Sequence, residues 1–334
     1  MPELPDIVVY LEALERRLVG ESMTGVRVQS PSVMRTYDPP YDAPVGETVR
    51  SLHRVGKRIV LGFGSHSEGG LPPSNPPPAQ TVGRQTGRPV RRVAEEGRSP
   101  AALYLVIHLM VAGRLRWEGP GKPIPRKVGL AAFDFEHGSL ILTEQGTRKR
   151  AGIWLFRDWE GVAGLDRGGV EPLEATEEEF AGALRAENRT LKRALTDPRI
   201  FSGIGNAYSD EILWEAQLSP VKRTSQLSDE EVSRLRAAVV GALQRWTDTL
   251  RQEVGEGWPS KVTAFRDDMA VHGKFGEPCP RCGSKVQRIV YSANETNYCA
   301  TCQTEGKLLA DRSLSRLLKD DWPKTLEELE ESER

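Results

Sequence analysis

The sequence predicts an α+β protein: an N-terminal β-sandwich with a leading helix, a helical second region, and a C-terminal module built on four cysteines. Three observations lead to this prediction. Strand-like segments separated by turn residues fill residues 24–63 and 103–156. Residues 176–253 show helical spacing almost throughout. Two Cys-x-x-Cys pairs then lie within residues 279–302.

The leading helix is predicted over residues 5–19, where apolar residues such as Ile7, Leu11 and Leu14 recur at helical spacing. Residues 64–100 are rich in Gly, Pro, Ser and Arg and cannot build a core, so we predict a disordered insertion there. The later strands are predicted at residues 103–117, 130–135, 139–143 and 152–156.

These patterns divide the chain into four predicted parts. They are the β-sandwich domain (residues 1–160), the helical domain (161–262), the cysteine module (263–310) and an acidic tail (311–334).

The charge of the 334-residue chain is unevenly distributed. Its formal net charge is −1 at pH 7. From residue 320 onward seven acidic residues stand against two basic ones, so this stretch carries −5 and the rest of the chain +4. A mildly basic body is compatible with nucleic-acid binding but does not demonstrate it.

Other features exclude whole classes of protein. No run of about 18 apolar residues is present, so we expect no membrane span. The N-terminus lacks a basic start followed by an apolar block, so we expect no signal peptide. A cytoplasmic location is therefore the default expectation, and in a reducing compartment paired cysteines indicate a metal site rather than disulfides.

The cysteine module has the spacing of a zinc ribbon. Cys279 and Cys282 form one pair, Cys299 and Cys302 the other, and sixteen residues separate the pairs. Four thiolates from two knuckles can hold one Zn²⁺ tetrahedrally, and two widely separated pairs favour zinc over an iron–sulfur cluster. The competing interpretation is four unrelated buried or redox cysteines. The ribbon alone does not identify a partner.

A glycine-rich turn lies between two helical stretches at residues 202–206. Gly203 and Gly205 let the backbone turn tightly and approach a partner closely. Asn206 falls where the next helix would start, and the free amides of a helix N-terminus favour a phosphate oxygen. An ordinary turn between helices is the equally weighted alternative.

The N-terminus offers chemistry of its own. Once Met1 is removed, Pro2 exposes a secondary amine whose pKa, about 7.7–8.0 for an α-amino group, leaves a useful neutral fraction near pH 7. A neutral amine can attack a sugar carbon and form a Schiff base, and Glu3 beside it could transfer protons. Lys57 precedes a strand and could hold a phosphate. The alternatives are a generic protein start and a solvated lysine.

Five segments, taken together and in this order, resemble the formamidopyrimidine-DNA glycosylase / endonuclease VIII family. The similarity covers nearly the whole chain except residues 64–100 and the acidic tail, and the joint pattern is far more specific than any single motif. The segments are MPELPD (1–6), VGKR (55–58), VEPL (170–173), GIGNAYSDEIL (203–213) and YCATCQ (298–303).

The resemblance implies a base excision repair enzyme that is both a DNA glycosylase and an abasic-site lyase. It implies a β-sandwich joined to a helix–two-turn–helix domain and a zinc finger with structural Zn²⁺. Damaged double-stranded or single-stranded DNA would lie between them with the target base flipped out. We therefore expect a monomeric bacterial protein, cytoplasmic and associated with the nucleoid.

Carried over position by position, the resemblance makes Pro2 the nucleophile and Glu3 the acid/base. Lys57 would bind the phosphate near the lesion and take part in catalysis. Asn206 would bind backbone phosphate. Glu171 matches an acid that lies near the site in relatives.

The sequence departs from the family at the expected DNA contacts. Asn294 stands where relatives carry an arginine near the tip of the finger, and an amide cannot replace a guanidinium fork on phosphate. Among the residues expected to fill the gap left by the flipped base, Met110 is displaced by one position and Val111 takes the aligned site. Arg150 remains, but Ala151 replaces an aromatic residue. The lesion preference therefore stays open.

Three function classes remain at this point. The first is the active glycosylase and lyase. The second is a DNA-binding relative with weak or no base excision that recognises abasic or structured DNA. The third is a zinc-ribbon protein acting on RNA or protein, which leaves Pro2, Lys57 and the glycine turn unexplained. The retained Pro2, Glu3 and Lys57 favour the first.

Overall fold

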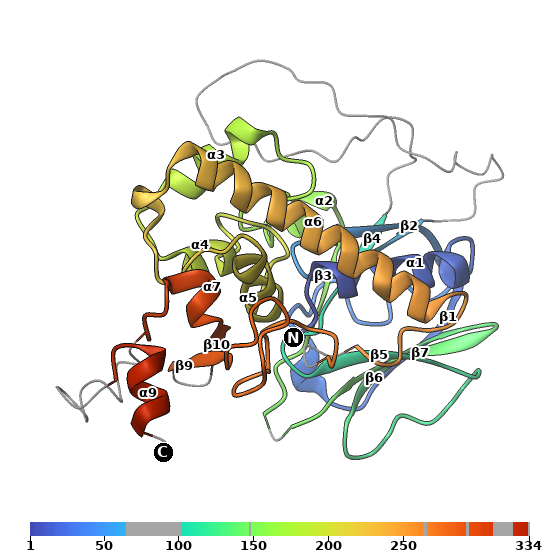
Figure 1. Cartoon of the computed structure of the whole chain (residues 1–334). Coiled ribbons are helices and arrows are strands. Elements are labelled where there is room, and N and C mark those ends of the chain that lie inside the picture. Colours follow the sequence, from blue (N-terminus) through green and yellow to red (C-terminus); the bar gives the residue numbers. More distant parts are fainter. Residues whose placement is uncertain (65–101, 147, 263–265, 292–293, 310–322, 333–334) are drawn as a thin grey trace.

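The computed structural model shows a strand-rich part and a helical part, with the cysteine module attached to the helical part (Figure 1). The predicted insertion at residues 64–100 lies, from residue 65 onward, outside the described residues. The structure describes residues 1–64, 102–146, 148–262, 266–291, 294–309 and 323–332.

The N-terminal part is a β-sandwich of two antiparallel four-stranded sheets, which confirms this element of the predicted fold class. One sheet has the order β1 (Met23–Val28), β6 (Gly129–Phe135), β7 (Gly138–Glu144) and β5 (Gly113–Glu118). The other has the order β2 (Thr48–Val55), β3 (Arg58–Gly64), β4 (Leu103–His108) and β8 (Gly152–Phe156). Alternate residues of both sheets, including Leu61, Leu105, Leu115 and Leu140, meet in one buried core.

The strand expected over residues 103–117 is wrong as a single element. β4 ends at His108 and β5 starts at Gly113, because the chain passes between them from one sheet of the sandwich to the other. Met110 adopts a positive φ of 53°, and the Gly113 N–H donates to the Leu109 carbonyl at 2.9 Å. A Cβ on Gly113 would lie 2.2 Å from that carbonyl oxygen, so only glycine fits this turn.

Helix α1 (Leu4–Leu18) joins the two parts of the molecule. Leu4 packs in the core of the helical part, whereas Ile7, Tyr10 and Leu14 pack in the sandwich core. The start of the chain therefore lies at the junction, where Figure 1 marks the N-terminus between the sandwich and the helices.

The helical part confirms the helices predicted from the spacing of apolar residues, and it confirms the residues predicted to start two of them. Thr176 and Ser228 cap α3 and α6, and each accepts the N–H of the glutamate three residues later. Arg251 of α6 pairs with Glu12 of α1 at 2.7 Å, so the longest described helix also bridges to the first one. The helices of this part are α3 (Glu177–Arg185), α4 (Leu191–Thr196), α5 (Asn206–Glu215) and α6 (Asp229–Val254). The short helix α2 (Trp159–Ala163) instead packs against β4 and β8 of the sandwich.

The cysteine module contains a hairpin of β9 (Gln287–Tyr291) and β10 (Asn294–Tyr298), followed by α7 (Ala300–Thr304). Part of the acidic tail returns to it as α9 (Leu326–Ser332). The Leu308 N–H donates to the Lys324 carbonyl at 2.9 Å, and Leu326 packs beside Ile289 and Tyr298. The described end of the tail is thus an extension of the finger rather than a separate arm.

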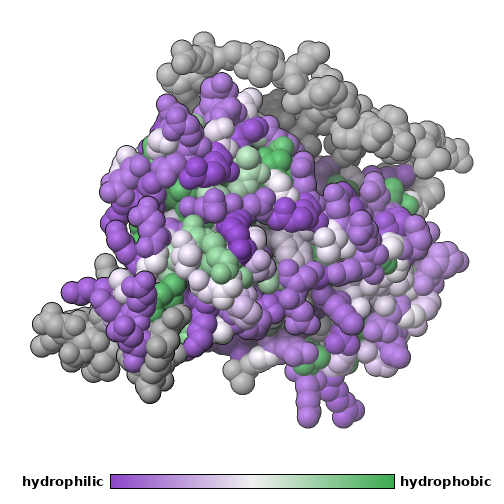
Figure 2. Space-filling view, in the orientation of Figure 1, coloured by the Kyte–Doolittle hydropathy of each residue, from purple (hydrophilic) through white to green (hydrophobic). Residues whose placement is uncertain are grey.

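The molecular surface is predominantly polar on the face shown in Figure 2, where hydrophobic residues occupy only small separate areas. Among the helices that the structure describes, none is both long and apolar enough to cross a bilayer.

Gly203 provides a test of how the fold fixes the chain start. Its φ is +80°, and a Cβ there would lie 2.8 Å from the Leu4 Cβ. Gly203→Ala should lower the free energy of unfolding by about 1–3 kcal/mol, because it combines a strained backbone with a clash. The control is Gly182→Ala in α3, where no atom lies within 4 Å of the new Cβ and a gain of about 0.5–1 kcal/mol is expected. Urea unfolding curves in which both variants change in the same direction would contradict this role of Gly203.

Candidate functional site

The site is built on the carboxylate of Glu3, which caps the N-terminus of α5, a helix about two hundred residues later in the chain. Glu3 is only 1% exposed and lies at the N-terminus of α5. Its carboxylate accepts the backbone N–H groups of Gly205 at 2.6 Å, Ala207 at 2.9 Å and Tyr208 at 3.3 Å. Helix N-terminal amides carry partial positive charge, so they stabilise this buried anion and fix its orientation.

The glycine turn makes this approach possible and brings Lys57 to the same place. A Cβ on Gly205 would lie 2.5 Å from Glu3 Cδ and 2.7 Å from Lys57 Nζ, so both side chains pass directly over this glycine. Lys57 stands in the turn between β2 and β3, after Gly56 with its φ of +62°. Burial lowers the pKa of Lys57, and the charges of Glu3 and Asp6 oppose that shift.

The start of the chain lies in the same cluster. Pro2 is buried, and the amino group of Met1 is close enough to Glu3, Arg114 and Lys57 to interact electrostatically with each. Burial lowers the pKa of this terminal amine, Glu3 opposes the shift, and Arg114 adds to it. An amine at this end of the chain therefore loses its proton more readily than an exposed one.

Asp6 is a second buried acid at the site. It is 3% exposed, and its carboxylate accepts the Glu3 N–H at 2.8 Å. Burial raises the pKa of Asp6 to about 7, against the effect of that hydrogen bond. When Asp6 is protonated, the folded protein does not have to bury a second negative charge beside Glu3.

Asn206 links the turn to the cysteine module. It is the first residue of α5, as the sequence predicted, and its Nδ2 donates to the Glu295 carbonyl of β10 at 2.8 Å. Asn294 begins β10, where it is the antiparallel partner of Tyr291, but its side chain lies outside what the structure describes. The finger hairpin therefore touches the helix end that holds Glu3.

Glu171 is held by a residue that the sequence reasoning missed. Arg54 of β2 forms an ion pair with Glu171, and its other nitrogen donates to the Gly56 carbonyl at 2.8 Å and the Ser202 hydroxyl at 3.3 Å. Arg54 thereby connects the lysine turn, Glu171 and the glycine turn. Its place three residues before Lys57 was the available signal.

The predicted gap-filling residues lie elsewhere, on loops of the sandwich. Arg150 is exposed in the β7–β8 loop, where its N–H donates to Glu144 at 2.7 Å. Ala151 is only 2% exposed and belongs to the sandwich core. Val111, at the β4–β5 turn, is 53% exposed and is the apolar side chain that this turn presents.

A lysine that the sequence reasoning did not select organises the glycine turn. Lys192 Nζ donates to the Asn206 carbonyl at 2.7 Å, to Ser209 Oγ at 2.8 Å and to Asp210 Oδ1 at 2.6 Å. Asp210 Oδ2 in turn lies 2.7 Å from His272 Nδ1. No local pattern distinguishes this lysine from a surface lysine, because its partners lie 14–18 residues away in the chain.

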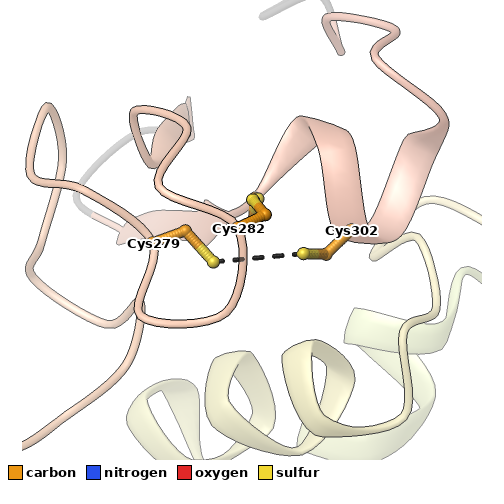
Figure 3. Close-up of side chains that lie close together, drawn as sticks. Cys279, Cys282 and Cys302 are labelled. Atoms are coloured by element: carbon orange, nitrogen blue, oxygen red, sulfur yellow. Dashed lines mark hydrogen bonds between the residues drawn. The ribbon is translucent and has the colours of Figure 1, made fainter.

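The four cysteines converge as the spacing predicted, and their geometry fits Zn²⁺. Their sulfur atoms all lie within 4.8 Å of one another. Cys279 and Cys302 are 4.0 Å apart and Cys282 and Cys299 are 3.4 Å apart, as measured between sulfurs. Zn–S bonds of about 2.3 Å place tetrahedral sulfurs roughly 3.8 Å apart. In Figure 3 the knuckle with Cys279 and Cys282 faces Cys302, which comes from α7. These residues would hold a closed structural zinc.

Loss of one thiolate should empty this site. Cys282→Ser should reduce the metal content from about one zinc per chain to near zero and lower the melting temperature, because the finger core surrounds the ligands. Elemental analysis of the purified protein measures this, with Thr301→Ser, inside the opposite knuckle, as a control that keeps all four thiolates. A Cys282→Ser protein that keeps full zinc would contradict the four-cysteine site.

The raised pKa of Asp6 predicts the pH dependence of stability. In the unfolded chain this carboxyl ionises near pH 4, whereas the folded protein keeps its proton up to about pH 7. The folded state binds more protons in that window, so the free energy of unfolding should fall as pH rises through it, by at most about 4 kcal/mol from this group. Asp6→Asn should flatten the melting temperature between pH 4 and 7. Asp267→Asn controls for loss of one surface charge, and an equal effect of both variants would refute the assignment.

Comparison with known proteins follows the same three regions. Residues 1–153 match the formamidopyrimidine-DNA glycosylase N-terminal domain. Residues 169–252 match the formamidopyrimidine-DNA glycosylase H2TH domain, and residues 276–304 match the zinc finger found in FPG and IleRS.

Individual relatives extend the match. An uncharacterized formamidopyrimidine-DNA glycosylase-like protein of Mycobacterium tuberculosis is 39% identical over 151 residues, which is 45% of this chain and 94% of that protein. The formamidopyrimidine-DNA glycosylase of Corynebacterium aurimucosum is 29% identical and covers 92% of this chain and 97% of its own. A structure of Lactococcus lactis FPG (MutM) with DNA containing an oxidized pyrimidine has a TM-score of 0.70 at 25% identity, over 91% of this chain and all of that one. This chain belongs to the formamidopyrimidine-DNA glycosylase / endonuclease VIII family.

Proposed function

We propose that this protein is a base excision repair DNA glycosylase that also acts as an abasic-site lyase, with the amine of Pro2 as its nucleophile. The observation that carries the proposal is the convergence of the chain start, Glu3 and Lys57 on the N-terminus of α5. Family relatives bear the name of the DNA glycosylase activity. An amine, a carboxylate and a half-buried cation side by side are the groups that sugar chemistry at C1′ requires.

The reaction begins when the nitrogen lone pair of Pro2 attacks C1′ of the damaged nucleotide. The bond from C1′ to the base breaks, and the base leaves with the electron pair and takes up a proton. The amine then loses its proton, the C1′–O4′ bond opens and O4′ gains a proton. The product is an iminium that joins Pro2 to C1′. Its positive charge acidifies C2′, so loss of a C2′ proton breaks the C3′–O bond and releases the 3′ phosphate. Water then frees the enzyme.

Glu3 is suited to carry the proton from the amine to O4′. Its Oε1 accepts one backbone N–H and its Oε2 accepts two, which leaves Oε1 with a lone pair for the substrate. The carboxylate is held by the main chain rather than by a mobile side chain, so no reorientation is needed before proton transfer.

Attack requires that Met1 be removed, because the nitrogen of Pro2 is otherwise part of an amide. Burial lowers the pKa of the amine at the chain start, against the opposing charge of Glu3, and we propose that burial likewise favours a neutral amine after that removal. Lys57 and Arg114 supply positive charge at the site. We propose that these two side chains bind the phosphate beside the lesion. We further assign Asn206, Arg150, Asn294 and Glu171 to the DNA-binding surface.

The partner is damaged DNA, which we propose the protein binds in double-stranded or single-stranded form as a monomer. Related FPG proteins have been seen with DNA that contains an oxidized pyrimidine or an abasic site. We also propose a place in the bacterial cytoplasm, at the nucleoid; the full-length relatives named above and their kin are bacterial proteins.

The nucleophile is tested by blocking the N-terminus. A short Gly-Ser extension ahead of Met1 should abolish both borohydride trapping and strand cleavage on abasic DNA, because Pro2 then stays in an amide. The same extension at the C-terminus is the control. Covalent trapping by the N-terminally extended protein would show that another residue attacks, and would overturn the assignment.

Glu3 is tested separately from the nucleophile. Glu3→Gln should lower excision of a damaged base by about 10²-fold or more, the usual worth of a positioned acid/base, but retain some cleavage of a ready-made abasic site. Glu15→Gln, an exposed position on the same helix, is the matched control. Equal losses on both substrates would assign Glu3 to structure alone.

A further inference from the structure

Two loops of the sandwich carry the side chains expected in the gap that a flipped base leaves. Val111 in the β4–β5 turn is 53% exposed, and Arg150 in the β7–β8 loop is exposed as well. The two loops adjoin neighbouring strands at the same level of the sheet, because Gly113 at the start of β5 is the antiparallel partner of Glu144 at the end of β7. Glu144 therefore lies between the loop with Val111 and the loop with Arg150.

The carboxylate of Glu144 fixes the second of these loops. Glu144 is only 2% exposed, and its Oε2 accepts the N–H groups of Arg150 at 2.7 Å and Ala151 at 3.0 Å. Burial of a polar group is unfavourable unless hydrogen bonds replace its contacts with water, and these two bonds meet that requirement. The main chain at Arg150 is therefore tied to the end of β7 through a buried side chain.

Arg35 holds the same two residues through their carbonyl groups. Its Nη2 donates to the carbonyls of Arg150 and Ala151, each at 3.2 Å. The main chain of Arg35 is itself anchored, because its N–H donates to the Ile153 carbonyl of β8 at 2.8 Å. Two side chains from different segments thus bind the N–H and the carbonyl groups of Arg150 and Ala151, which lie outside any strand.

We propose that Glu144 and Arg35 are positioning residues for base removal: they hold Arg150 at a fixed distance from Val111, so that both side chains can enter the duplex as the damaged base leaves it. The inference rests on the proposed function, since it needs DNA as the substrate. A loop that is already ordered loses less conformational entropy when it enters the duplex than a free loop does. The hydrogen bonds to Arg150 and Ala151 provide this order before DNA binds.

The test is the ratio of two rates in one duplex sequence, excision of a damaged base and cleavage of a ready-made abasic site. Excision requires that a stacked base leave the duplex, whereas an abasic site has no base to flip. Glu144→Ala should lower this ratio by about tenfold or more, because the gap-filling side chains lose their fixed positions. The damaged base is the one that the wild type removes fastest among 8-oxoguanine, thymine glycol and dihydrouracil.

A loss of folded protein lowers both rates equally, so the ratio does not respond to stability alone. Asp134→Ala is the matched control, because this carboxylate is 16% exposed, accepts Arg27 and Ser139, and lies at the opposite end of the same sheet. It should leave the ratio unchanged. Glu144→Gln should restore the ratio to within about twofold of the wild type, since an amide oxygen can accept the same two N–H groups.

Arg35→Ala tests the same proposal from the other side of the loop. It should lower the ratio in the same direction, and Arg35 is exposed, so this variant serves even if Glu144→Ala fails to fold. The double variant should lose less than the product of the two single losses, because both side chains hold the same two residues.

A second readout reports the gap directly. In a duplex with a non-cleavable abasic analogue opposite 2-aminopurine, wild-type protein should change the fluorescence of that base as Val111 and Arg150 enter. Arg35→Ala and Glu144→Ala should lose most of this change at saturating protein. This measurement needs no excision, so it tests the inference even in a protein that only cleaves abasic DNA.

The outcomes separate the two proposals. Wild-type protein that neither excises a base nor traps abasic DNA would refute the proposed function and the inference with it. An active wild type whose ratio and fluorescence change are both kept in Glu144→Ala and Arg35→Ala would overturn only the present inference. A Glu144→Gln protein as impaired as Glu144→Ala would also overturn it, because the two hydrogen bonds would then not be the cause.

Discussion

The interaction on which the molecule depends is the contact between the Glu3 carboxylate and three main-chain N–H groups at the start of α5. More than two hundred residues separate the two sides of this contact. It offsets the cost of burying a carboxylate by placing it at the positive end of a helix. The start of the chain is thereby fixed in space, although chain termini are usually among the least ordered parts of a protein.

The surrounding structure serves this contact from several directions. Gly203 turns the backbone so that its carbonyl accepts the Leu4 N–H at 2.9 Å, and Gly205 leaves room for Glu3 and Lys57. Arg54 fastens the lysine turn to the glycine turn through Ser202. The cysteine module reaches the same helix end through Asn206. The sandwich, the helical part and the cysteine module thus each contribute residues to the site at the N-terminus of α5.

The sequence predicted the parts whose signals are local: the sandwich strands, the capped helices, the cysteine pairs and the glycine turn. It could not predict contacts between distant polar residues, such as Arg54 with Glu171 or Lys192 with Asp210, because no period or spacing encodes them. The break between β4 and β5 depends on the left-handed backbone of Met110. The sequence does not predict this conformation, because residues other than glycine rarely adopt it. The domain boundaries and the roles of the site residues remain predictions.

The split of α1 between two cores has a consequence for biosynthesis. Leu4 is buried among helices that are translated later, whereas Ile7 and Tyr10 are buried in the sandwich. During synthesis the sandwich can therefore close while the first residues of the chain still lack their permanent neighbours, because residues 203–208 have not left the ribosome. The amine that we propose as the nucleophile thus gains its permanent neighbours only when most of the chain has been made. The nascent protein carries this amine from the beginning of synthesis, but the groups proposed to act with it join it late.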